Sequence, residues 1–360
     1  MRFLVISVIS LAFLSSCDRT SKDRYVSINS PIYIEQFDVE QTPTSLDCFP
    51  NDEIGIGSIK VLDSLLIVGH LNNWSIYDKT EKKHIGNYLS VGEGPEEFSY
   101  LLACSNSYFG LVNDTLSALI PDKDHHRIVK LNLQRCKERN PDCLSTYLHS
   151  DYMENKTWDA IICEPNSYFV SQPHPDMLGF NRVLIESDEP HRFSCAMEMD
   201  TLKVNDSGVL NLLARVTHYE PTQEMFVETM AYLNQINLFS RDGKTGKTLC
   251  VGRELDNLDL KELEFKTGNR KKGYITASVW PCGFGAAYSG QTELERMSGE
   301  NIQSDLQFFD WDGNPRYRFK LPGYVISFDI DFDEKILYVV DNQDDLLRAY
   351  DATPIIESLR

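Results

Sequence analysis

The fold is decided by the C-terminal stretch LQFFDWDGNPRYRFKL at residues 306–321, which is followed by SFDIDFDEKILYVVDNQDDLLRAYD at residues 327–351. Short apolar and β-branched runs alternate there with turns rich in Asp, Gly and Asn, a pattern typical of strands joined by tight turns. Similar units occur earlier in the chain, at residues 61–89, 115–133 and 236–252. The repetition predicts a protein built from several small β-sheets.

Units of several strands at a spacing of roughly 40–50 residues are characteristic of a β-propeller, in which each unit forms one blade. About 320 folded residues at roughly 50–55 per blade give six blades, with seven shorter blades as the alternative. A pair of two-sheet sandwiches is the other architecture compatible with the strands. No helix of ten or more residues stands out, and the best helical candidate is Asp256–Phe265. We therefore expect an all-β, six-bladed β-propeller.

The ends of the chain indicate how the ring closes. The last unit supplies only three strands, and one further strand, Ile32–Phe37, precedes the first full unit. In a closed propeller a strand from the other terminus can complete the last blade and so hide an open sheet edge. We expect Ile32–Phe37 to do this.

The N-terminus, MRFLVISVISLAFLSSC at residues 1–17, has the organisation of a bacterial lipoprotein signal. Arg2 precedes an apolar run that is shorter than the roughly 20 residues needed to span a bilayer, so the run is a targeting signal and not a membrane helix. Cleavage is expected before Cys17, whose thiol would carry the lipid.

Three segments follow from this interpretation. Residues 1–16 form the signal peptide, the polar residues 17–30 form a flexible tether, and residues 31–360 form a single propeller domain. The mature protein is expected to be exported and lipid-anchored to the cell envelope. Asp18 follows the lipidated cysteine, and in some bacteria an aspartate at this position retains a lipoprotein in the inner membrane. Because the rule differs between bacteria, the inner and the outer membrane stay open as alternatives.

The composition limits the partners. The formal net charge is −19, and 42 % of the residues are hydrophobic, which is enough for a large core. Such a negative field repels phosphate backbones, which excludes nucleic acid as a partner. It also repels anionic lipid headgroups, so the lipid anchor must hold the protein at a membrane. We expect a monomer.

Three stretches resemble the TolB-like six-bladed propeller lipoproteins of bacteria. They are the LSSC lipobox, the segment GEGPEEF at Gly92–Phe98, and the C-terminal hairpins quoted above. Residues 135–300 are similar only in their strand rhythm. The resemblance implies a fold and a location, but no activity, because propellers host unrelated functions.

GEGPEEF could hold an ion, but it has neither the lysine nor the helix of a phosphate-binding loop. We expect Gly92 and Gly94 to permit a turn with positive φ, and Phe98 to fill the core between blades.

Asp329, Asp331 and Asp333 alternate and would share one face of a strand, which makes calcium the alternative to no cofactor. We favour a half-solvated strand there. His125 and His126 are adjacent and point in different directions, so a hairpin tip is expected rather than a metal site.

The cysteines other than Cys17 contain no C-x-x-C pair. Cys136 and Cys143 flank a polar loop and could close a disulfide in an oxidising compartment. We interpret four others as small buried side chains: Cys104, Cys163, Cys195 and Cys250. The four tryptophans are expected to pack between blades rather than to bind sugars: Trp74, Trp158, Trp280 and Trp311.

No nucleophile motif is present. The sequence therefore favours a binding or scaffolding module for an envelope protein, a peptide or a glycan over an enzyme. The alternative is a metal-dependent propeller enzyme, similar to lactonases or lyases, with a site in the central channel. A carbohydrate-binding accessory of a glycan uptake system is a third possibility.

Overall fold

The computed structural model describes residues 28–48, 55–94, 97–140, 142–153, 157, 159–173, 180–187, 189–196, 214–253, 271–299, 301–342 and 346–360. The expected signal peptide, Cys17, most of the expected tether, Trp158 and the helix expected at Asp256–Phe265 lie outside these residues. Ile28, at the end of the expected tether, is already buried and donates its backbone N–H to Thr248 Oγ1 (2.7 Å).

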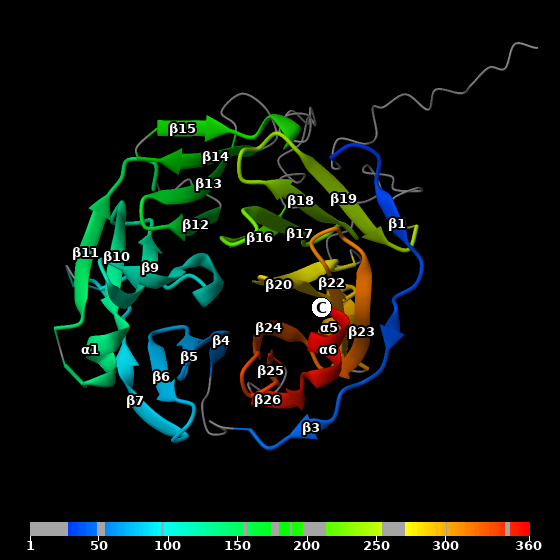
Figure 1. Cartoon of the computed structure of the whole chain (residues 1–360), viewed down its shortest axis with the longest axis horizontal. Helices are drawn as coiled ribbons and strands as arrows, with labels where there is room; N and C mark the ends of the chain where they lie inside the picture. The colour runs from blue at the N-terminus through cyan, green and yellow to red at the C-terminus, as the bar shows by residue number, and fades with distance from the viewer. Residues whose placement is uncertain are drawn as a thin grey trace, which may run out of the picture.

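Six small sheets surround a central axis (Figure 1), so the chain is the expected six-bladed, all-β propeller. The alternatives of seven blades and of paired sandwiches were wrong. Blade one contains β4 (Ile56–Leu62), β5 (Leu65–His70), β6 (Trp74–Asp78) and β7 (Lys83–Tyr88). Blade two contains β8 (Tyr108–Val112), β9 (Thr115–Asp122), β10 (Arg127–Asn132) and β11 (Leu144–His149). Blade three contains β12 (Asp159–Glu164), β13 (Ser167–Pro173), β14 (Phe180–Glu186) and β15 (Glu189–Arg192).

Each of the other three blades includes one N-terminal strand, which is a fifth strand in blades four and five and the fourth strand in blade six. Blade four contains β16 (Arg215–Glu220), β17 (Met225–Met230), β18 (Ile236–Ser240), β19 (Gly246–Val251) and β1 (Ile32–Ile34). Blade five contains β20 (Tyr274–Trp280), β21 (Gly283–Tyr288), β22 (Gln303–Phe309), β23 (Pro315–Pro322) and β2 (Val39–Glu40). Blade six contains β24 (Val325–Asp331), β25 (Ile336–Asp341), β26 (Leu346–Asp351) and β3 (Ser45–Leu46).

We call residues 28–46 the strap, because they run along the outside of blades four, five and six (Figure 1). The ring is closed by an N-terminal strand as expected, but the closing strand is β3, which pairs antiparallel with β26 through Leu46 and Ala349. The expected strand Ile32–Phe37 was assigned to the wrong blade. Its residues in β1 pair in parallel with β19 instead. A strand of two residues such as β3 has no recognisable alternation, which is why the sequence did not reveal it.

The hydrophobic core is divided into six clusters, one between each pair of neighbouring blades. Trp74 and Phe98 lie between blades one and two, and Trp280 packs between blades five and six. A cluster that contains Tyr77 and Tyr338 joins blade six to blade one and so completes the ring. Each sheet buries both faces against its neighbours, which explains apolar runs such as LLIV in β5.

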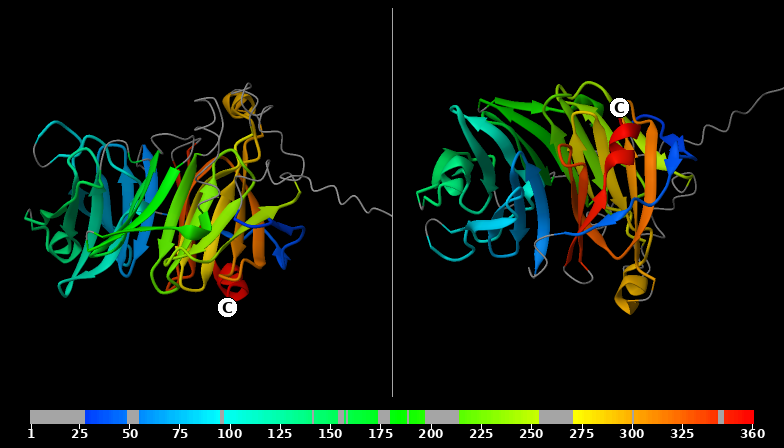
Figure 2. Two further views of the ribbon diagram at one scale, coloured as in Figure 1. Left: turned by 90° about the horizontal axis from the view of Figure 1, so that it is seen from above. Right: turned by 60° about the horizontal axis from the view of Figure 1, so that its bottom comes forward.

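The helices in the described residues are short and lie between strands or at the end of the chain. They are α1 (Leu133–Lys137), α5 (Glu293–Ser298), α6 (Thr353–Ser358), and the 3₁₀ turns η2 (Cys104–Asn106) and η3 (Ser194–Ala196). Helix α5 projects from one face of the disc, and α6 lies toward the other (Figure 2). Within the described part of the chain, no helix is long and apolar enough to cross a membrane.

Candidate functional site: the central cavity

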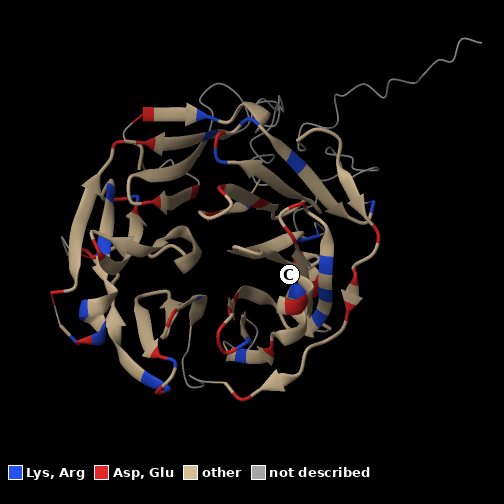
Figure 3. Ribbon diagram, in the orientation of Figure 1, with Lys and Arg blue, Asp and Glu red and all other residues tan. Residues whose placement is uncertain are grey.

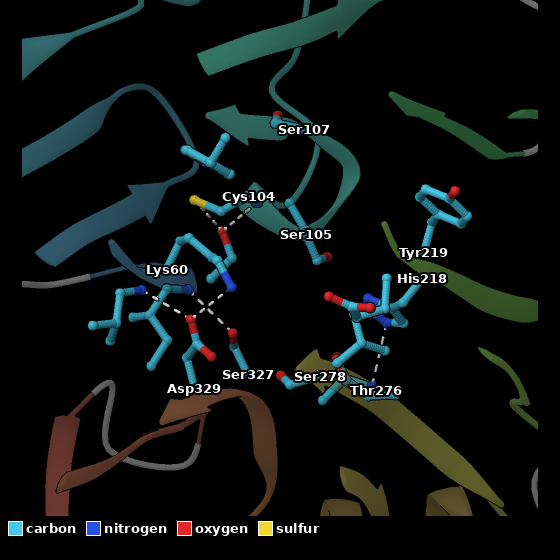
Figure 4. A pocket seen from close by; sticks show the side chains of 18 of the residues that line it. Lys60, Cys104, Ser105, Ser107, His218, Tyr219, Thr276, Ser278, Ser327 and Asp329 are labelled. Atoms are coloured by element: carbon cyan, nitrogen blue, oxygen red, sulfur yellow. Dashed lines mark hydrogen bonds and ion pairs between the residues drawn. The ribbon is translucent and has the colours of Figure 1, made fainter. Parts of the chain in front are cut away.

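The first strand of each blade lies nearest the axis, and these six inner strands surround a cavity of about 400 Å³. Every blade contributes to its wall, because residues of β4, β8, β12, β16, β20 and β24 all line it. Ligand-binding pockets commonly measure 300–1,000 Å³, so this cavity is large enough for a small molecule. We therefore take the central cavity as the candidate site (Figure 4).

Lys60 and Asp329 form the central ion pair of this cavity. Lys60 belongs to β4 and Asp329 to β24, the neighbouring inner strand, and Nζ lies 3.0 Å from Oδ2. The lysine side chain is 28 % exposed, whereas the aspartate side chain is 3 % exposed. The lysine therefore keeps access to the cavity, while the carboxylate is part of the wall.

The Asp329 carboxylate is saturated with hydrogen bonds. Besides Lys60, Oδ2 accepts from the backbone N–H of Val61 (2.9 Å). The other oxygen, Oδ1, accepts from Trp280 Nε1 (2.8 Å) and from the backbone N–H of Ile330 (3.0 Å). A carboxylate offers about four lone-pair sites, and all of them are used here. Asp329 thus holds Lys60 in place and has no lone pair left for a ligand.

Hydroxyl groups line the same cavity as the lysine. Ser105, Ser107, Thr276, Ser278 and Ser327 line the cavity together with Ser58. Ser327 Oγ accepts from the backbone N–H of Ile59 (3.1 Å), and the Ser278 hydroxyl donates to the Phe328 carbonyl oxygen. Figure 4 shows Lys60, Ser105 and Ser327 around the same opening. The wall is therefore suited to hydrogen bonding with a polar ligand.

His218 also lines the cavity, but it is not a good general base. It is 2 % exposed, and its Nε2 accepts a hydrogen bond from the backbone N–H of Ala277 (3.3 Å). Burial, followed by the positive charge of Lys60, lowers the pKa of His218 to about 3. The imidazole is consequently neutral at physiological pH, and its acceptor nitrogen is occupied.

Cys104 is equally unsuited to nucleophilic attack. Its Sγ accepts from Ser58 Oγ (3.3 Å), and its backbone N–H donates to the same hydroxyl (3.0 Å). Burial raises the pKa of the Cys104 thiol to about 12, so the thiol stays protonated. The interpretation of Cys104 as a small buried side chain is confirmed.

Among the described residues, no group of three or more His, Cys, Asp and Glu side chains is arranged to hold a metal ion. The alternating aspartates differ from the expectation of a half-solvated strand, which was wrong: Asp329 and Asp331 are buried, and only Asp333 is exposed. Asp331 forms an ion pair with Lys79 and accepts from the backbone N–H groups of Asp333 and Glu334. Both faces of β24 are covered because it is an inner strand between two blades.

GEGPEEF folds around one of its own carboxylates. The Gly94 N–H donates to Glu97 Oε2 (2.7 Å), and a side chain at Gly92 would collide with the same carboxylate. Neither glycine has positive φ, so that expectation was wrong; the glycines give space to Glu97 instead. Phe98 is fully buried between blades one and two, as expected. Pro95 and Glu96 lie outside the described residues.

The remaining sequence candidates have structural roles. His125 Nδ1 and Arg127 Nε both contact Asp122 Oδ2 (2.9 and 2.8 Å) across a hairpin tip, which confirms that interpretation. Cys136 and Cys143 are buried in the core between blades one and two and are not joined by a disulfide in this structure. Packing between blades is confirmed for three tryptophans: Trp74, Trp280 and Trp311.

A buried charge network joins blades three and four. Glu228 accepts from Arg182 Nε and Nη2 (2.8 Å each) and from Asn237 Nδ2 (2.9 Å), and it pairs with Arg215 Nε (3.0 Å). Burial by itself would raise the pKa of Glu228, but the two arginines lower it to about 2. This network stabilises the wall beside the cavity.

Sequence reasoning missed Lys60 and His218, and it took Asp329 only as a calcium candidate. The available signal was a charged residue inside an apolar run, since Lys60 interrupts IGSIKVL. A charge within a strand that is buried on both faces needs a partner, but that partner lies on another blade.

A comparison with solved structures supports the fold. A structure of a DUF4221 family member from Bacteroides vulgatus is similar, with a TM-score of 0.53, 9 % identity and coverage of 88 % of this chain and 96 % of that one. Calcium-binding regucalcin from Agrobacterium tumefaciens has a TM-score of 0.47 at 11 % identity, with 87 % and 94 % covered. At 9 % identity the likeness to the DUF4221 structure concerns the fold alone, and nothing is argued from the weaker match to regucalcin. No family model and no curated protein matches the chain.

Proposed function

We propose that this protein is an exported, lipid-anchored propeller of the bacterial cell envelope that binds a ligand or partner and performs no chemistry of its own. The observation that carries the proposal is the central cavity, where Lys60 is accessible and the groups that could catalyse are occupied. Asp329 is saturated with hydrogen bonds, His218 is neutral, and Cys104 is a protonated thiol. Such a wall recognises a molecule without exchanging protons with it.

The alternative of a metal-dependent enzyme requires carboxylates or imidazoles that converge on the axis. The described channel residues do not supply such a set, and the two buried aspartates of β24 are ion-paired with Lys60 and Lys79. We therefore favour binding, and calcium is left as a test in the Discussion.

The location and the affiliation are part of the same proposal. The segment MRFLVISVISLAFLSSC supports export and lipidation at Cys17, and the lipobox with GEGPEEF supports a relation to TolB-like propeller lipoproteins. The net charge of −19 supports a partner other than nucleic acid. An envelope protein, a peptide or a glycan is the partner class proposed, and the protein itself is proposed to be a monomer.

The test is a crosslinked pull-down of the full-length protein from its native envelope, with Cys17→Ala as the mislocalised control. Metabolic labelling with a palmitate analogue should mark the wild-type protein and not the variant. We expect a stoichiometric envelope component with the wild type and much less of it with Cys17→Ala. Recovery of the protein alone, together with turnover of lactone or glycoside substrates, would overturn the proposal.

A further inference from the structure

Two side chains of the central cavity, Lys60 and Ser327, keep hydrogen-bond donors that the described residues do not use. A lysine ammonium has three N–H bonds, and that of Lys60 makes one ion pair, with Asp329. Ser327 Oγ accepts from the Ile59 N–H, which leaves its own proton to donate.

The acceptors of Asp329 are already in use. All four lone-pair sites of Asp329 are filled by the donors described above. Glu220, the other carboxylate of the wall, is buried and accepts from the backbone N–H of Gln223 through Oε2 (2.7 Å). Hydroxyl groups can donate or accept, and Lys60 is the lysine or arginine that lines the described part of the cavity.

We propose that the central cavity binds a small organic carboxylate, with Lys60 Nζ as its counter-charge and Ser105 and Ser327 as hydrogen-bond donors. This inference deepens the proposed function and rests on it. A single ammonium with hydroxyl donors beside it suits one carboxylate better than a phosphate, which is usually bound by several cationic or backbone donors. Phe109, Ile162 and Val279 give the cavity apolar wall for the organic part of the ligand.

The size of the cavity limits the ligand. A volume of about 400 Å³ admits a small metabolite, but not a folded domain. The carboxylate can belong to a free molecule or to the C-terminus of a short peptide, and these share the same recognition chemistry.

Calorimetric titration of the full-length protein in detergent tests the inference with matched pairs of probes. Benzoate is compared with benzamide, succinate with succinamide, and the dipeptide Ala-Ala with its C-terminal amide. Each pair keeps shape and removes charge. We expect each carboxylate that fits to bind at least about tenfold more tightly than its amide, because a charge-assisted hydrogen bond is lost. The dipeptide pair separates a peptide source from a free metabolite.

Variants identify the residue. Lys60→Met removes the charge at similar length and should weaken carboxylate binding by about tenfold or more, while Lys60→Arg should retain most of it. Lys137→Met is the matched control, because Lys137 Nζ binds Ser64 Oγ in the turn between β4 and β5 and does not line the cavity, so that binding should stay unchanged. Thermal unfolding checks each variant, and Ser327→Ala, which should weaken binding a few-fold, replaces Lys60→Met if that variant does not fold.

Equal affinity for the carboxylates and their amides would overturn the carboxylate assignment. So would carboxylate binding by folded Lys60→Met that is as tight as that of the wild type. Absence of binding by every carboxylate at a ligand concentration of about 10 mM would also overturn the assignment. The pull-down above is independent of this result: a partner recovered equally with Lys60→Met would leave the proposed function intact and remove only the cavity ligand.

Discussion

Glu228 and Glu35 both pair with arginine, but they lie in different environments. Glu228 is fully buried between blades three and four and is bound by Arg182, Arg215 and Asn237. Glu35 lies on the strap, where its 3.0 Å pair with Arg253 has side chains that are 67 % and 63 % exposed. Figure 3 shows that many charged residues of this acidic protein lie on the outer strands and loops, like Glu35.

The difference is one of solvation. An exposed ion pair exchanges water contacts for a similar interaction and contributes about 0–1 kcal/mol. A buried carboxylate has lost its water entirely, so each oxygen must be matched by donors from the protein. In this propeller the matched carboxylates lie between blades and along the axis, which means that they connect blades and shape the cavity.

The largest effect is expected from Glu228→Gln. The change leaves Arg182 and Arg215 buried without their shared carboxylate and should lower the free energy of unfolding by about 3–5 kcal/mol. Denaturant unfolding measures it, with Glu35→Gln as the control at under about 0.5 kcal/mol. Equal losses in the two variants would mean that burial does not distinguish these pairs.

Acid should reduce the contribution of Glu228 to the free energy of unfolding. The pKa of Glu228 is lowered from its usual 4.5 to about 2, so its contribution is complete above about pH 4.5 and is lost as the pH falls through about 2. The shift corresponds to about 3 kcal/mol. Burial raises the pKa of the neighbouring Asp159, so the contribution of Asp159 to the free energy of unfolding changes with pH in the opposite direction. The stability difference between wild type and Glu228→Gln, measured from pH 6 to pH 2, should therefore narrow with acid; a constant difference would contradict the assignment.

At the axis, Asp329→Asn should lower the free energy of unfolding by about 2 kcal/mol. The loss is smaller than for Glu228→Gln because Lys60 is partly solvated and the amide keeps some of the four hydrogen bonds. Asp333→Asn is the control from the same strand region, since Asp333 is exposed. Its unfolding free energy should stay within about 0.5 kcal/mol of the wild type. Comparable losses of unfolding free energy in both variants would mean that Asp329 does not behave as a buried carboxylate.

The smallest effect is expected from calcium. Asp329 and Asp331 are ion-paired with lysines, so addition of millimolar Ca²⁺ or of EDTA should leave the melting temperature unchanged within about 1 °C. Calorimetry provides the measurement, and Mg²⁺ serves as the ionic-strength control. A calcium-specific rise of several degrees would show a cation site that the lysines do not exclude.

The sequence predicted the parts of this structure that depend on local pattern. Strand alternation and turns such as Asp312-Gly313 indicated hairpins, and the hairpins follow one another blade by blade. The burial of Phe98 and the hairpin tip at His125 were also predicted, because each is a property of neighbouring residues. The half-solvated interpretation of Asp329 and Asp331 failed, because local alternation cannot show whether a second blade covers the polar face.

By itself, then, the sequence determined the all-β class, the six blades and an N-terminal strand that closes the ring, since all three depend on a repeated hairpin pattern. Only the tertiary structure decided that Ser45–Leu46 closes the ring and that Lys60 meets Asp329 at the axis. Neighbouring groups such as Val61 and Asp329 are 268 residues apart in the chain. Circular closure brings such residues together, and no local periodicity records which inner-strand charges will face one another.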